Sequence, residues 1–215
     1  VSFLNSNYGK AASVAFSAAI LIRLFNEVWS NTSVVGGYYG KSGSREFIIS
    51  AILFTVITLG YTVLGGLRSS IVTDVIQAII FVFFVGWVIT LILPQHNISE
   101  FVTSGSWTMQ AGVDMLLVTI LQLFSYPFHD PVLTDRGFIA EEKTMLRAFI
   151  VSGILGFISI LIFSFIGIHA KLIGMEVSSN VPAALGKTLG VAGYFAMIVV
   201  MISAAGSTLD STFAS

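Results

Sequence analysis

The 215-residue chain contains no cysteine, and only 10% of its residues are charged. Without cysteine it can form neither a disulfide framework nor a thiolate metal site. A soluble domain averages about 25% charged residues, so this chain has too little charge for a surface that faces water. A formal net charge of -1 provides no basic footprint for nucleic acid.

Hydrophobic residues, in contrast, make up 55% of the chain, and 18 of its residues are phenylalanine. A transmembrane helix needs roughly 20 mostly apolar residues. Six stretches meet or approach that length, at about 12–38, 47–66, 70–93, 112–128, 147–170 and 190–213. Their apolar runs do not alternate with polar residues, which favours helices over membrane strands. We therefore predict an all-α, multi-pass transmembrane bundle in a lipid bilayer, with a single domain over 1–215.

Neither end of the sequence looks like a natural terminus. The chain begins at Val1 without methionine, and no cleavable signal peptide is visible there. Its last hydrophobic run continues to Ala214. We expect a fragment, truncated at both ends, from the middle of a longer transporter-sized protein.

The connecting segments differ in charge, which bears on orientation. The segment 134–147 is densely charged and contains Arg136, Lys143 and Arg147, whereas 94–107 contains no lysine or arginine. Positive residues favour the cytoplasmic side of a membrane. We expect 134–147 to be cytoplasmic and 94–107 to lie on the opposite side.

The segment 60–77 joins two apolar runs through the pair Gly65 and Gly66. Glycine permits a sharp turn without a clash at Cβ, so this pair predicts a hinge. Asp74 falls inside the second run, and an ionisable group within a span indicates a functional site. Two interpretations stay open: Asp74 caps its helix or pairs with Arg68 near the interface, or it has a role in binding or releasing a cation.

Polar residues also interrupt the first span, on one stripe of the expected helix. They are Arg23, Asn26, Glu27, Ser30 and Asn31. The i,i+4 spacing of Arg23 and Glu27 suits an ion pair. This stripe serves either to tie the helix to its neighbours or to form a wall of a solute cavity.

The fourth span ends at Pro127 and Pro131, with Tyr126, His129 and Asp130 around them. Two prolines four residues apart should interrupt a helix, and unwound backbone at membrane depth indicates a binding site in transporters. These three polar residues are therefore candidates for the solute cavity. The alternative is a plain helix end that enters the charged loop. No second histidine or cysteine at useful spacing supports a metal site at His129.

The last span carries a face of small residues at Ala204, Ser207, Thr208 and Ser211. Such faces commonly serve only helix packing. Hydroxyl and carbonyl oxygens are, however, the ligands that a hard cation such as Na⁺ prefers. Asp210 offers a second cation position beside Ser211.

Three motifs in this order resemble those of the sodium:solute symporter family. They are Gly60-Tyr-Thr-Val-Leu-Gly-Gly-Leu-Arg-Ser69 with its continuation to Gln77, Asp135-Arg-Gly-Phe-Ile-Ala-Glu-Glu-Lys-Thr144, and Ala204-Ala-Gly-Ser-Thr-Leu-Asp-Ser211. The resemblance implies a fold of two inverted five-helix repeats (LeuT-like), of which this chain would be the third to eighth core helices.

The resemblance also implies roles for individual residues. Ala204 would provide a carbonyl, and Ser207 and Thr208 their hydroxyls, to a sodium site. A second or transient sodium site would contain Asp74, Asp210 and Ser211. Asp130 falls near a polar substrate contact of the sugar carriers, although its proline-rich surroundings differ from theirs.

We therefore expect a sodium-coupled symporter of a small organic solute, working by alternating access in the plasma membrane. Sodium would be the coupling ion, with no other cofactor or metal. No nucleophile, base and oxyanion donors converge, which argues against an enzyme. The alternatives are the sensor module of a membrane signalling protein and a solute facilitator without ion coupling. Amino acids, urea, polyamines and small carboxylates all fit as solutes.

Overall fold

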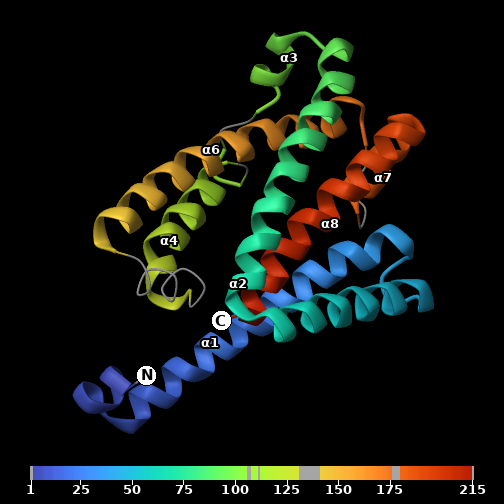
Figure 1. Ribbon diagram of the computed structural model, residues 1–215. Coiled ribbons are helices and arrows are strands. Elements are labelled where there is room, and N and C mark those ends of the chain that lie inside the picture. Colours follow the sequence, from blue (N-terminus) through green and yellow to red (C-terminus); the bar gives the residue numbers. More distant parts are fainter. Residues whose placement is uncertain (1, 106–107, 111, 131–140, 176–179, 215) are drawn as a thin grey trace.

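The computed structural model describes residues 2–105, 108–110, 112–130, 141–175 and 180–214, and these form helices and connecting loops without a strand. The prediction of an all-α chain is confirmed for these residues. The helices are α1 (Ser2–Tyr39), α2 (Arg45–Ile92), the short 3₁₀ helix η1 (Leu93–Gln95), α3 (Ile98–Thr103), α4 (Val113–His129), α6 (Glu142–Leu172), α7 (Val181–Thr188) and α8 (Gly190–Ala214) (Figure 1). Most of the predicted loop motif at 135–144 lies outside the described residues.

Four of the described helices are long and apolar enough to cross a membrane. They cover Phe3–Tyr39, Arg45–Gln95, Glu142–Leu172 and Gly190–Ala214, while Val113–Tyr126 is a shorter apolar helix. By length and composition, this is an integral membrane protein. Large apolar side chains are exposed along these helices, where they suit contact with lipid.

The longest helix, α2, bends sharply at Gly66. A straight helix of its 48 residues would extend about 72 Å, more than twice the bilayer core of about 30 Å. Gly66 has φ 59° and ψ -158°, a conformation essentially restricted to glycine. The predicted hinge therefore lies at the bend, and the predicted spans 47–66 and 70–93 fall on two arms of one helix (Figure 1).

Helix α8 packs against α2, and α1 and α7 also pack on α8. Glycine permits close approach at one point of the α2–α8 contact, because a Cβ at Gly206 would lie 2.8 Å from Gln77 Nε2. Helix α6 packs against α2 away from the bend, where a buried apolar core forms. This core comprises Val88, Ile92, Phe101, Ile166, Ala170, Leu185, Ala196 and Met197.

Candidate functional site

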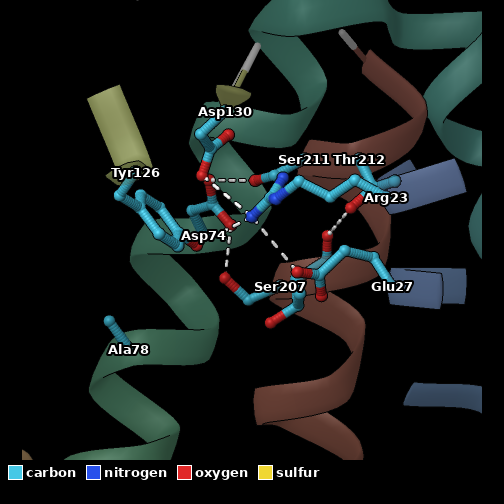
Figure 2. Close-up of a pocket in the computed structure, with 10 residues that line it drawn as sticks. Arg23, Glu27, Asp74, Ala78, Tyr126, Asp130, Ser207, Ser211 and Thr212 are labelled. Carbon is cyan, nitrogen blue, oxygen red and sulfur yellow. Dashed lines mark hydrogen bonds and ion pairs between the residues drawn. The ribbon is translucent and has the colours of Figure 1, made fainter. Parts of the chain in front are cut away.

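An open cavity of about 430 Å³ lies between residues of α1, α2, α4 and α8 (Figure 2). Its lining is mainly polar and charged. The lining residues are Arg23, Glu27, Asp74, Ala78, Tyr126, Asp130, Ser207, Thr208, Ser211 and Thr212. Members of the two predicted sodium sites and of the predicted solute cavity therefore share one space, although they come from distant parts of the sequence.

Arg23 joins α1 to the end of α4 across this cavity. Its Nη2 lies 3.2 Å from Glu27 Oε1 and 3.2 Å from Asp130 Oδ2. The same nitrogen donates to the Tyr126 hydroxyl at 3.0 Å, and the guanidinium lies 4.9 Å from the centre of the Tyr126 ring. Arg23 thus forms an ion pair and also lines the cavity, so the two interpretations of this residue are compatible.

Helix α4 continues through Pro127 and ends at His129. Asp130 follows with an extended backbone, at φ -98° and ψ 103°. The first proline therefore does not interrupt the helix, and the geometry is that of a helix end, which was the alternative interpretation. The Asp130 carboxylate is buried and faces Arg23. The side chain of His129 lies outside the described part of the structure.

Asp74 links the second arm of α2 to α8. It accepts hydrogen bonds from Ser207 Oγ at 2.5 Å and from Ser211 Oγ at 3.2 Å. This carboxylate therefore lies against hydroxyl groups inside the bundle, whereas Arg68 is exposed. Oxygen atoms of two types, charged and neutral, converge at this point of the cavity wall.

Asp210 is fully buried behind the cavity and holds the two arms of α2 together. Its Oδ2 accepts hydrogen bonds from Tyr61 Oη at 2.9 Å and Thr73 Oγ1 at 2.6 Å, and its Oδ1 from Ser70 Oγ at 3.1 Å. Tyr61 precedes the bend at Gly66, while Ser70 and Thr73 follow it. A buried charge is tolerated only when it is well hydrogen-bonded, and these hydroxyls fulfil that requirement.

Ser211 connects the two carboxylates. Its Oγ lies 3.2 Å from Asp74 Oδ2 and 3.4 Å from Asp210 Oδ1. The three residues of the predicted second sodium site are therefore neighbours. A single hydroxyl hydrogen can bond only one of these carboxylates fully, so their hydrogen bonding is coupled through Ser211.

The predicted sodium ligands on α8 also lie together. Thr208 is exposed to the cavity, and its hydroxyl donates to the Ala204 carbonyl at 3.2 Å. Ser207 is one residue away and bonds Asp74. These oxygen atoms are of the type that Na⁺ prefers, and Ser207 and Thr208 line the cavity.

Two predicted cavity residues do not reach the cavity. Asn26 is exposed on α1, and Asn31 donates from Nδ2 to the Glu27 carbonyl of its own helix at 2.8 Å. Neither belongs to the lining. Only Arg23 and Glu27 from the predicted polar stripe face the cavity.

Tyr61, which bonds Asp210, and three serine or threonine residues of the site were not among the predicted site residues. Ser70 and Thr73 bond Asp210, and Thr212 joins the cavity lining. A signal for the first two is present in the sequence, because positions 70, 73, 74 and 77 recur on one face of a helix. Thr212 follows Thr208 by one helical turn on α8.

No protein-family model, no curated protein and no solved structure matches this chain. The resemblance drawn from the sequence motifs therefore stays a prediction.

Proposed function

We propose that the chain belongs to a sodium-coupled symporter of a small organic solute, with the two-repeat fold expected from the motifs and a place in the plasma membrane. One observation carries this proposal. Residues predicted as cation ligands and residues predicted as solute contacts line a single cavity inside an integral membrane protein. Polar groups at membrane depth are costly and commonly mark a transport pathway.

The cation would bind between α2 and α8. Asp74 supplies a carboxylate, and Ser207 and Ser211 supply hydroxyls within hydrogen-bond distance of it. A hydroxyl that donates to a carboxylate still has lone pairs for a cation. Sodium in this position would therefore gain one charged ligand and two neutral ones, with Thr208 beside Ser207 and the Ala204 carbonyl bonded to Thr208.

The solute would bind in the same cavity, beside Arg23, Tyr126 and Asp130. These residues provide a planar cation, an aromatic ring with a hydroxyl, and a carboxylate. Such a combination can bind both donors and acceptors of a polar solute. The cavity of about 430 Å³ falls within the range of about 300–1,000 Å³ that small-molecule sites occupy.

Coupling would pass through the bend of α2. The Asp210 carboxylate holds residues on both sides of Gly66, and Ser211 connects it to Asp74 in the cavity wall. A cation at Asp74 would thus change the hydrogen bonds that fix the bend. If sodium raises the affinity for solute in this way, the solute must raise the affinity for sodium equally.

The test is uptake of a panel of labelled solutes by the complete protein in vesicles, with sodium or potassium in the external buffer. We expect accumulation of one solute class only with sodium. Replacing Thr208 by Ala should raise the sodium concentration for half-maximal uptake about tenfold. This corresponds to a loss of roughly 1.4 kcal/mol in the free energy of sodium binding. Thr208→Ser retains the hydroxyl and should stay near the parent value.

Each alternative function gives a different result in the same assay. Uptake that is equal in sodium and potassium would identify a facilitator and overturn the proposal. Solute binding without uptake would favour a sensor. An unchanged sodium dependence in Thr208→Ala would remove Thr208 from the sodium site.

A further inference from the structure

Two histidines and a glutamate form a chain of contacts at the end of the second arm of α2 that lies away from the bend. His96 follows η1, Glu100 lies on α3, and His169 lies in the last turns of α6 (Figure 1). His96 Nε2 is 2.8 Å from His169 Nδ1, and His96 Nδ1 is 3.0 Å from Glu100 Oε2. These residues take no part in the cavity and are separated by up to 73 positions in the sequence.

The contacts restrict where protons can lie. A carboxylate only accepts hydrogen bonds, so His96 Nδ1 carries the hydrogen that faces Glu100. The 2.8 Å contact between the two rings then needs one N–H and one lone pair. This hydrogen bond forms when both rings are neutral, because His169 Nδ1 then donates to His96 Nε2. It also forms when His96 alone is charged, because His96 Nε2 then donates to His169 Nδ1. Two charged rings would place N–H against N–H, and no hydrogen bond would remain.

The surroundings oppose a second proton. His169 is only 1% exposed, and the buried Phe101 ring makes a T-shaped contact with the His96 ring, at a centroid distance of 5.5 Å. Glu100 is the acidic group facing His96, and Lys171 is a nearby cation, which donates to the Ser104 carbonyl at 2.5 Å. The described parts of α2 and α7 contribute apolar side chains to the adjoining core. No described carboxylate is bonded to His169 to balance a charge there.

We propose that His96 and His169 form a proton-sensitive latch between the η1–α3 segment and α6. The latch is closed while the pair carries at most one extra proton, and it opens when both rings are charged. Histidine is the side chain whose charge changes between about pH 5 and pH 8. Acidification would therefore separate α3 from the end of α6 and expose part of the core around Phe101. The latch goes beyond the proposed transport function and does not depend on it.

The absence of native cysteine from the sequence makes a distance measurement simple. Spin labels would be attached at Val102→Cys on α3 and Ile173→Cys at the end of α6, both at exposed positions. Pulsed electron paramagnetic resonance of the protein in lipid nanodiscs would give their separation at about pH 8 and about pH 5, with a chelator in both buffers. We expect a short, narrow distance distribution at the higher pH and loss of that population at the lower pH.

Matched variants assign the effect to the pair. His169→Asn places an amide group near the position of Nδ1, and His96→Gln does so for Nε2, but neither amide can take up a proton in this range. Both variants should keep the short distance at both pH values. A parent protein whose distances do not change with pH would overturn the latch, as would a variant that opens like the parent.

A measurement on the unsubstituted chain covers the case in which a variant does not fold. Nitrogen NMR of protein labelled at histidine should detect a coupling across the His96–His169 hydrogen bond at about pH 8, and the coupling should disappear at about pH 5. If no such coupling exists at the higher pH, the latch is wrong.

Discussion

Helices α6 and α8 are both long and apolar enough to cross a membrane, yet they differ in which side chains they bury and which they expose. Helix α8 buries Ser203, Asp210, Ser211 and Thr212 within the bundle, whereas α6 exposes large apolar residues along most of its length. Water is absent from the bilayer core, so polar side chains must find partners in the protein. The polar content of each helix therefore shows where it meets protein and where it meets lipid. Substitutions on the two helices test this difference.

The largest effect is expected at Asp210. Its replacement by Ala would remove the common acceptor of Tyr61, Ser70 and Thr73. Thr73 retains the carbonyls of its own helix as acceptors, but Tyr61 and Ser70 would lose a charged partner. At about 1.5–3 kcal/mol for each hydrogen bond to a charged group, we expect a loss of about 3 kcal/mol or more in the free energy of unfolding.

Unfolding in mixed detergent micelles measures this loss, with Asp210→Asn as the matched control. The amide retains one acceptor oxygen in nearly the same position, so it should cost less than Ala. If Asp210→Ala costs less than about 1 kcal/mol, which is the net value of a single ordinary hydrogen bond, Asp210 does not hold the bend.

An intermediate effect is expected at the bend itself. Gly66→Ala adds a Cβ at a position whose backbone conformation, with φ at 59°, only glycine adopts readily. It should lower the free energy of unfolding by about 1–3 kcal/mol. Gly60→Ala is the matched control, because Gly60 lies in the helical first arm and a Cβ there meets nothing within 4 Å. The control should be neutral or stabilising by up to about 1 kcal/mol. The same unfolding assay applies, and equal effects at both positions would contradict a strained bend.

Much of the fold was accessible from the sequence because apolar runs and glycine have local consequences. The predicted helical stretches match the observed helices to within one residue at each overrunning end, and the predicted hinge lies at the bend of α2. The end of α4 was harder to predict, since proline is normally unfavourable within a helix. Helix α4 continues past this proline to His129.

The sequence predicted individual residues of the candidate site better than it predicted which of them lie together. Asp74, Ser207 and Ser211 stood out because polar residues are rare in apolar helices, and the structure brings them into contact. In contrast, nothing local in the sequence pairs His96 with His169, because their contact depends on how the ends of α2 and α6 pack. Asn26 shows the converse error: it lies on the predicted polar stripe, yet it is exposed and outside the cavity.

The smallest effect is expected on the exposed side of α6, which we expect to face lipid. Ile160 is 73% exposed and Ile166 is 3% exposed, so the same change to Ala can be compared at two positions of one helix. Ile166→Ala leaves a cavity in the core and should cost about 2–5 kcal/mol. Ile160→Ala should stay within about 0.5 kcal/mol, because acyl chains surround this side chain in the folded bundle and also in a separated helix.

The same unfolding assay, with the protein in lipid, compares the two variants. If Ile160→Ala destabilises as much as Ile166→Ala, protein and not lipid must cover that face of α6. Both helices would then be surrounded by protein, and they would differ only in which protein segments contact them. An effect at Ile166 alone would instead show that the exposed apolar surface of α6 adds little to the stability of the bundle, whereas its buried contact with the core adds much.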